Sequence, residues 1–228
     1  MATIAPPTTT GVLFSGGLDS GILIGQFVRQ KRNVVPFFIR SGLVWQWEEL
    51  EAARRFTQAV ASPYLAAPVV LELPLDDVYG EHWSVTGTTI PDGSSPDEAV
   101  YLPGRNAMLV IKAATWCQLH GIGELALGVL GTSPFDDART PFFENLEAAM
   151  NCPPAKPIRL TRPFSKMDKR QVMLLGRGLP LEHTFSCLSP VGRLHCGVCN
   201  KCAERRKAFR LADLEDPTNY AAALAPSG

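Results

Sequence analysis

The chain alternates short apolar runs with longer segments in which apolar residues recur at helical spacing. Apolar runs predict strands over residues 11–14, 34–39, 69–73 and 124–129. Helical spacing predicts helices over residues 21–28, 47–61, 107–120, 141–150, 169–176 and 203–211. Because the first strand, helix and strand follow within one short stretch, they predict a βαβ unit and a parallel sheet covered on both faces. The expected fold class is therefore α/β and Rossmann-like.

Two details refine this pattern. Asn106 precedes an apolar helical segment and is expected to be its N-cap. Residues 85–103 are rich in Gly, Ser, Thr, Pro and Asp and are too long for a bare connection, so they are either disordered or a functional loop. Because this segment runs into Leu102-Pro103-Gly104-Arg105-Asn106, we favour a loop over an active site.

The strongest chemical signal is a glycine turn between the first predicted strand and the first predicted helix. It reads Ser15, Gly16, Gly17, Leu18, Asp19 and Ser20. Two glycines let the backbone approach an anion closely, and the free N–H groups at the start of the helix hold a phosphate. The serines can donate further hydrogen bonds, and Asp19 either holds Mg²⁺ or caps the helix. The spacing and the missing lysine exclude a Walker A loop.

A cysteine cluster near the C-terminus predicts a metal site. Its members are Cys187, Cys196, Cys199 and Cys202. Four thiolates satisfy a structural zinc ion, although a Cys₄ iron–sulfur cluster uses the same ligands. His195 lies directly beside a ligating cysteine and is not expected to reach the same ion. The basic residues of the following helix, among them Lys201 and Arg205, are expected to form a solvated face.

Composition excludes some classes of function. The 228 residues contain 22 Lys plus Arg and 22 Asp plus Glu, so the formal net charge is zero, which argues against a nucleic-acid partner. Residues 1–10 lack the features of a secretory signal, and no apolar run approaches the roughly 18–20 residues that span a bilayer. We therefore expect a soluble, cytoplasmic protein with no membrane partner.

Three motifs in this order carry a family resemblance: the Ser-Gly-Gly-Leu-Asp-Ser turn, the Leu102–Asn106 segment and the Cys187/His195–Cys202 cluster. Together they resemble 7-cyano-7-deazaguanine synthases, the QueC family of PP-loop ATPases, over nearly the whole chain. The resemblance implies an adenine nucleotide α-hydrolase-like (PP-loop) domain over residues 10–180 and a small helical zinc-binding region over residues 181–228. It also implies a homodimer.

The resemblance further implies an ATP-dependent ligase that converts 7-carboxy-7-deazaguanine to its nitrile with ammonia, through adenylated carboxylate and amide intermediates. ATP, Mg²⁺ and Zn²⁺ are the implied cofactors. The family pattern places ATP on the glycine turn and Asn106, and it gives catalytic roles to Arg105, Asp136 and Lys169. Asp136, Asp137 and Arg139 fall where the family has a polar loop with an Asp and an Arg, and for the aspartate pair a functional and a purely structural role are both open.

Departures from the family pattern keep a second function open. The Gln-Arg-His segment that usually follows the second strand is replaced here by a stretch containing Trp45 and Trp47, which either stack on a planar base or pack in the core. The loop at residues 131–139 also lacks an acidic residue near its start. The alternative is a relative that adenylates a related carboxylate and transfers it to a protein or a small amine. A binding module without catalysis and a sulfur-transferring tRNA enzyme are less favoured.

Overall fold

The computed structural model describes residues 9–222, so most of the N-terminal segment considered for a signal lies outside the described residues. The strands are β1 (Thr9–Leu13), β2 (Asn33–Arg40), β3 (Val69–Glu72), β4 (Glu124–Leu127) and β5 (Arg159–Thr161). The helices are α1 (Leu18–Arg29), α2 (Gln46–Ala59), α3 (Asp76–Tyr79), α4 (Trp83–Thr86), α5 (Arg105–Leu119), α6 (Thr140–Met150), α7 (Lys169–Leu175) and α8 (Asn200–Leu211). Short 3₁₀ turns are η1 (Asp97–Val100), η2 (Asp136–Ala138) and η3 (Leu181–His183).

All five strands run parallel in the order β3-β2-β1-β4-β5. The chain moves outward from β1 to β2 and β3, then crosses back to add β4 and β5 on the other side. The point of reversal therefore lies between β1 and β4, where open α/β sheets bind ligands beyond the carboxyl ends of their strands. The predicted parallel α/β fold is confirmed.

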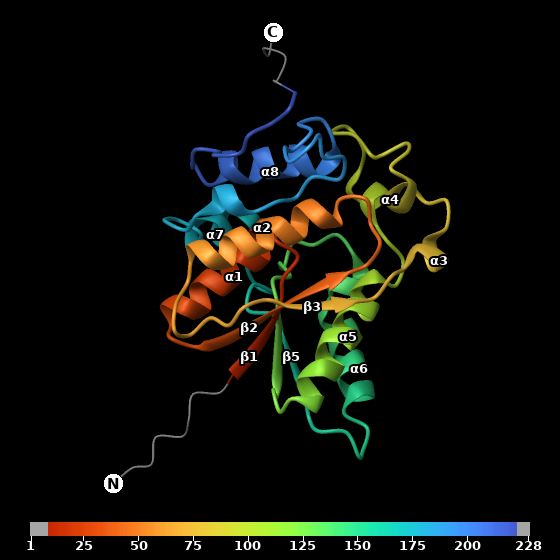
Figure 1. Cartoon of the computed structure of the whole chain (residues 1–228), viewed down its shortest axis with the longest axis vertical. Coiled ribbons are helices and arrows are strands. Elements are labelled where there is room, and N and C mark those ends of the chain that lie inside the picture. The colour runs from red at the N-terminus through yellow and green to blue at the C-terminus, as the bar shows by residue number, and fades with distance from the viewer. Residues whose placement is uncertain (1–8, 223–228) are drawn as a thin grey trace.

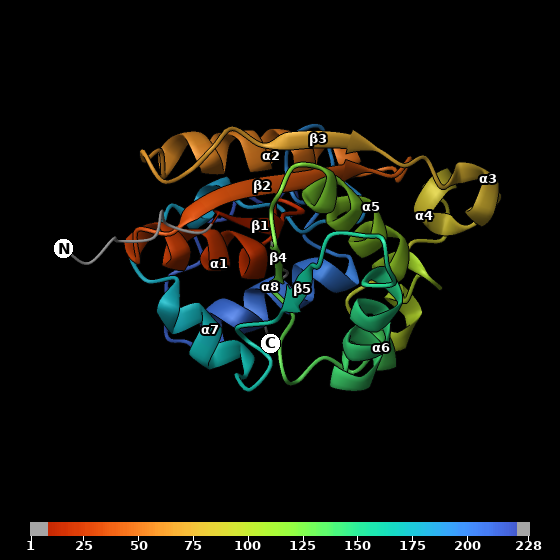
Figure 2. The same cartoon turned by 90° about the horizontal axis from the view of Figure 1, so that it is seen from below.

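Helices cover both faces of this sheet (Figures 1 and 2). Side chains from α1, α2, α7 and α8 pack on one face of the sheet, and side chains from α5 and α6 pack on the other. Strand pleating sorts the residues between the two cores: Val12 and Phe14 belong to the first, and Leu13 packs against the second. Both faces of the central strands are thus apolar, which explains their continuous apolar runs in the sequence.

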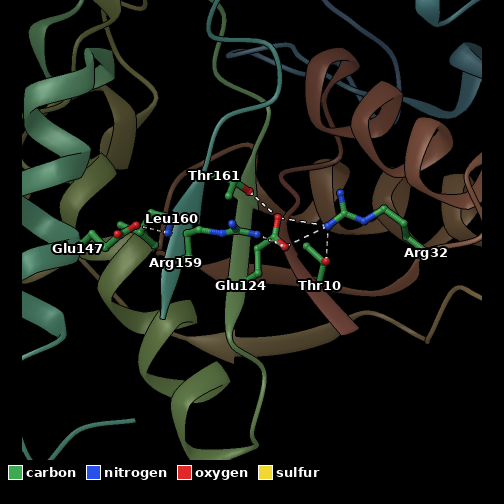
Figure 3. Close-up of polar contacts among 7 residues, drawn as sticks. All are labelled: Thr10, Arg32, Glu124, Glu147, Arg159, Leu160 and Thr161. Carbon is green, nitrogen blue, oxygen red and sulfur yellow. Dashed lines mark hydrogen bonds and ion pairs between the residues drawn. The ribbon is translucent and has the colours of Figure 1, made fainter. Parts of the chain in front are cut away.

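The carboxylate of Glu124 links neighbouring strands at the amino-terminal end of the sheet (Figure 3). Glu124, at the first position of β4, accepts hydrogen bonds from Arg32 at 3.1 Å, Arg159 at 3.2 Å and Thr161 at 2.9 Å. Arg32 also donates to the Thr10 hydroxyl at 2.7 Å. These contacts connect β1, β4 and β5 at the end of the sheet opposite to the strand carboxyl ends.

Some predictions from the sequence need correction. Strand β5 was not predicted, because only three residues pair and two of them, Arg159 and Thr161, are polar. The one-turn helices α3 and α4 were also missed. Asn106 is not the N-cap of α5; that position is taken by Gly104, whose φ of 73° is left-handed, and Asn106 lies in the first turn. Within residues 9–222, no helix combines the length and apolar character that crossing a bilayer requires.

Candidate active site and metal centre

A cavity of about 360 Å³ opens at the carboxyl ends of β1, β2 and β4, which is a volume typical of small-molecule sites. Its walls come from the glycine turn after β1, the first turns of α2 and α5, the segment before α5, and the C-terminal metal region. Sequence segments far apart in the chain therefore converge at the reversal point of the sheet. The fold thus places this cavity where the strand order predicts a ligand.

The glycine turn is shaped for close backbone approach. Gly16 has a φ of 81°, and a Cβ added there would overlap the backbone carbonyl of Glu49. Gly17 is the N-cap of α1, and no side chain caps this helix. The N–H groups of the first turn of α1, together with its dipole, are thereby directed toward an anion in the cavity. Ser15, Gly17, Leu18, Asp19 and Ser20 all line the cavity.

Asp19 does not cap α1 but pairs with Lys169, the first residue of α7. The ammonium lies 2.9 and 2.8 Å from the two carboxylate oxygens of Asp19 and 3.7 Å from Glu204. Burial lowers the pKa of Lys169, but the Asp19 and Glu204 carboxylates outweigh it and the pKa is raised. Lys169 is therefore a fixed cation beside the glycine turn. Lys201 continues the network through a 2.7 Å contact with Glu204.

Arg105 and Asn106 project from the first turn of α5 into the same cavity. Asn106 hydrogen-bonds Asp137, whose pKa is raised by burial against the effect of this hydrogen bond. Asp136 lies outside the cavity: its carboxylate is 92 % exposed and pairs with Arg139 at 2.9 Å. The structure brings Asp137, rather than Asp136, to the site.

Unpartnered buried polar atoms gather at this cavity. Within residues 9–222, five buried side-chain nitrogen or oxygen atoms have no hydrogen-bond partner, and three belong to cavity residues: Arg105 Nε, Asp137 Oδ1 and Ser186 Oγ. A buried polar group without a partner costs roughly 1–3 kcal/mol, so such groups are rare outside functional sites. A polar ligand in the cavity can satisfy all three. The cavity is thus suited to a polar molecule.

Helix α2 adds an acidic group and an aromatic wall. Glu49 is half-buried at the cavity, and Trp45 forms a hydrogen bond to its carboxyl group. Trp83 stacks on Trp45 with ring centroids 5.7 Å apart, and both line the cavity. Trp47 takes neither predicted role: its side chain is 53 % exposed, and Arg40 lies over its ring. Nothing in the sequence singled out Glu49, because it lies in a glutamate-rich segment typical of a solvated helix.

The four predicted cysteines form one buried cluster. Their sulfur atoms all lie within 4.8 Å of one another, and two pairs are 3.9 Å apart. Tetrahedral thiolates at a Zn–S distance of about 2.3 Å would be about 3.8 Å apart, so the geometry fits zinc. Backbone N–H groups of neighbouring loop residues point at these sulfurs, as expected for thiolates. His195 instead accepts a hydrogen bond from the backbone N–H of Ser186, as its exclusion from the cluster predicted.

The metal region and the active-site cavity share residues. Cys187 lines the cavity, and α8, which starts immediately after Cys199, contributes Lys201 and Glu204 to it. The expectation of a solvated basic face on this helix is therefore wrong for Arg205. That side chain is 2 % exposed because it donates hydrogen bonds to residues of the preceding loop.

The long loop before α5 is ordered and joins these regions. Gly93 N–H donates to the carbonyl of Val198 at 2.8 Å, and Asn200 N–H donates to Pro91 at 3.0 Å. Farther along, Val100 and Tyr101 reach the cavity wall. The preference for a loop bordering the site is confirmed. Figure 1 shows α8 and the adjoining metal loop at one end of the molecule, beside α7 and α2.

Comparison with known proteins identifies the family. The family model described as queuosine biosynthesis protein QueC matches residues 10–213. The chain belongs to the QueC family. A 7-cyano-7-deazaguanine synthase of Solidesulfovibrio magneticus is 30% identical, over 98% of this chain and 100% of the relative. One from Syntrophobacter fumaroxidans is 31% identical over 92% and 94%, and one from Methanothermobacter thermautotrophicus is 27% identical over 91% and 97%.

The fold of this QueC-family chain is also found in a solved structure. The U34-tRNA thiolase NcsA from Methanococcus maripaludis, determined with its 4Fe-4S cluster, matches with a TM-score of 0.51 and 14% identity. The match covers 99% of this chain and 80% of the thiolase. At this identity the likeness concerns the PP-loop-like α/β fold alone. The family resemblance and the fold class inferred from the motifs are both confirmed.

Proposed function

We propose that this protein is an ATP-dependent carbon–nitrogen ligase that converts 7-carboxy-7-deazaguanine to 7-cyano-7-deazaguanine with ammonia. The family and the names of its relatives support the substrate. One structural observation carries the chemistry: an uncapped helix N-terminus, Lys169 and Arg105, whose Nε has no hydrogen-bond partner, all line one cavity. A nucleotide and an acid can therefore occupy the cavity side by side.

The chemistry requires activation because a carboxylate is a poor electrophile. An oxygen of the acid attacks the α-phosphorus of ATP, the α–β phosphoanhydride bond breaks, and pyrophosphate leaves. Ammonia then attacks the acyl carbon, AMP leaves, and loss of a proton gives the amide. Adenylation of the amide oxygen by a second ATP, followed by loss of AMP and the remaining N–H protons, gives the nitrile. The protein mainly has to bind, align and exclude water.

Each step uses residues at the cavity. We assign phosphate binding to the backbone of Gly16–Ser20 and to the Ser15 hydroxyl, with Lys169 offsetting the charge of the departing pyrophosphate. Arg105 would hold the oxygen of the acid. Asn106 and Asp137 would fix the position of the ring, with Asp137 in the role first considered for Asp136.

The metals have separate roles. We propose structural zinc at the four cysteines, because four thiolates leave no open coordination position for catalysis. Mg²⁺ would be bound mainly through ATP phosphate oxygens. Asp19 is its candidate protein ligand, since a carboxylate that contacts Lys169 keeps further lone pairs.

The test combines product and half-reaction measurements. The purified protein is incubated with 7-carboxy-7-deazaguanine, ATP, Mg²⁺ and ammonium chloride, and the nitrile, AMP and pyrophosphate are quantified. We expect two AMP for each nitrile, and Arg105→Gln should lower the rate while leaving the protein folded. No nitrile and no AMP would refute the proposal, whereas AMP formation only with a different acid would favour transfer to another nucleophile.

The remaining predictions concern the assembly and its surroundings. A homodimer and a cytoplasmic location stay predictions. The boundary at residue 180, between the PP-loop domain and the C-terminal zinc-binding region, is also a prediction. Light scattering coupled to size-exclusion chromatography measures the first directly. A mass of twice 24.8 kDa is expected.

A further inference from the structure

One acidic group at the cavity has no role in the steps assigned above. Glu49 lies in the first turns of α2, and its backbone carbonyl abuts Gly16 of the phosphate loop. Its side chain reaches the cavity beside the stacked pair Trp45 and Trp83. Glu49 therefore lies next to the place where the activated acid would form.

This carboxyl group has no direct ion pair among the described residues, although the Arg105 charge acts on it from beyond 4.0 Å. Burial raises the pKa of Glu49 to about 8, against the opposing effects of the Arg105 charge and the Trp45 hydrogen bond, while Glu48 adds a small upward effect. Within residues 9–222, no ion pair of 4.0 Å or less includes Glu49. With this pKa the carboxyl group is mostly protonated at neutral pH, and a cation that enters with the substrates shifts it toward the carboxylate.

The chemistry of the walls selects the kind of cation. Mg²⁺ requires six ligands, mostly oxygen atoms and water, whereas Glu49 is flanked by indole rings. A carboxylate beside aromatic rings is instead a favourable environment for an ammonium group, which donates a hydrogen bond to the oxygen and is attracted to the rings. The proposed reaction needs such a cation, because its nitrogen source is mainly ammonium at neutral pH.

We propose that Glu49, with Trp45 and Trp83, forms the ammonium-binding site of this enzyme and that Glu49 is the base that converts ammonium to ammonia; this rests on the proposed function. An N–H bond of ammonium breaks and its proton moves to a Glu49 carboxylate oxygen. The freed lone pair forms the C–N bond to the acyl carbon, and the C–O bond to AMP breaks with its electron pair leaving on AMP. The nitrogen then loses a proton to water, and Glu49 returns its own proton to water before the next turnover.

The experiment separates activation of the acid from delivery of nitrogen. Glu49→Gln keeps the shape of the side chain but cannot accept the proton. The acyl adenylate is trapped with hydroxylamine, a nucleophile that is uncharged at neutral pH and needs no base to release it from a cation. In parallel, kcat and KM for ammonium are measured by amide and nitrile formation.

We expect E49Q to form the hydroxamate within about threefold of the wild-type rate, while kcat/KM for ammonium falls by about 10²-fold. Trp83→Leu should raise the KM for ammonium about two- to fivefold without changing hydroxamate formation. Glu48→Gln, on the same helix but outside the cavity, is the matched control and should behave like wild type.

Two results would overturn the Glu49 proposal alone: wild-type ammonium kinetics in E49Q, or an equal loss of hydroxamate and amide, which would place Glu49 in ATP or acid binding. Circular dichroism confirms that each variant is folded. Absence of hydroxamate with the wild-type protein would overturn the proposed function and this inference together.

Discussion

Gly16 combines two constraints at one residue. Its φ of 81° is left-handed, and an added Cβ would overlap the Glu49 carbonyl of α2. We expect Gly16→Ala to displace the phosphate loop, weaken ATP binding by at least about tenfold and destabilise the fold by about 1–2 kcal/mol. Isothermal titration with ATP and urea unfolding measure the two effects.

A matched variant separates the effect of the close contact with Glu49 from the effect of the left-handed backbone conformation. Gly121 has a φ of 73°, but nothing lies within 4 Å of an added Cβ. Gly121→Ala should therefore show a similar cost of the left-handed conformation with unchanged ATP binding. Equal ATP affinity in the Gly16 variant and the wild type would contradict the assignment of this turn to phosphate.

Lys169 supplies the fixed positive charge beside the phosphate loop. Lys169→Met removes this charge and leaves Asp19 facing the phosphates, so pyrophosphate release should slow by about 10²–10³-fold. Lys166→Met, at an exposed position three residues earlier, should have little effect. The measurement is the rate of pyrophosphate release that requires 7-carboxy-7-deazaguanine, under saturating ATP. A rate within twofold of wild type would show that the cation is only structural.

At the scale of elements, the sheet depends on Glu124 at its amino end. Burial raises the pKa of Glu124, but the hydrogen bond from Thr161 and the contacts with Arg32 and Arg159 outweigh it and the pKa is lowered. A lowered pKa in the folded state means that the carboxylate stabilises the fold at neutral pH. This stabilisation begins to decrease as the pH falls below about 4.5, the ordinary pKa of a glutamate. It is lost once the pH has fallen below the lower pKa of Glu124 in the folded state.

Glu124→Gln should therefore lower the free energy of unfolding by about 1–3 kcal/mol at pH 7. The difference from wild type should shrink as the pH falls toward 3, because the wild-type carboxyl group is then protonated too. Glu51→Gln is the control, since its exposed pair with Arg54 contributes roughly 0–1 kcal/mol. Urea titrations across this pH range decide the matter; a pH-independent difference would mean that charge plays no part.

At the scale of the whole molecule, the metal centre and the catalytic cavity form one unit. Helix α8 begins at the cysteine cluster and carries Lys201 and Glu204 into the cavity. We infer that a metal bound by these cysteines would hold an active-site wall in place, because Cys187 itself lines the cavity and the loop at residues 91–95 hydrogen-bonds to Val198 and Asn200 beside them.

Removing the metal should therefore affect stability and ATP binding together. Cys199→Ser is expected to lose about one zinc ion per chain by elemental analysis and to lower Tm by about 10 °C or more, which corresponds to roughly 3–5 kcal/mol for a chain of this length. Cys152→Ser, at an exposed cysteine outside the cluster, is the control. Unchanged ATP affinity in a folded, metal-free protein would show that the cysteine cluster and the cavity act independently. Iron in the wild-type protein, together with visible absorbance, would show that the cysteines hold an iron–sulfur cluster instead of zinc.

Local sequence patterns predicted the elements that fill the core. The apolar runs of β1, β2 and β4 were sufficient because both faces of these strands are buried, and both faces of the edge strand β3 pack against the core. Strand β5 could not be predicted this way, since its three residues contain a single apolar side chain, Leu160, and pair only with β4. Likewise, no local signal distinguishes Asp137 from Asp136, because only the path of η2 decides which carboxylate faces the cavity.

The sequence by itself predicted the parallel α/β fold, the glycine turn to which we assign phosphate binding and the cluster of four cysteines, because each has a signal in residues that are close neighbours along the chain. Only the tertiary structure decided which distant side chains meet: Asp19 with Lys169, Trp45 with Trp83, and Arg205 with Thr184 inside the core rather than on the surface. Such contacts join segments up to 150 residues apart. They depend on how helices pack at the end of the sheet, and spacing along the chain carries no information about that packing.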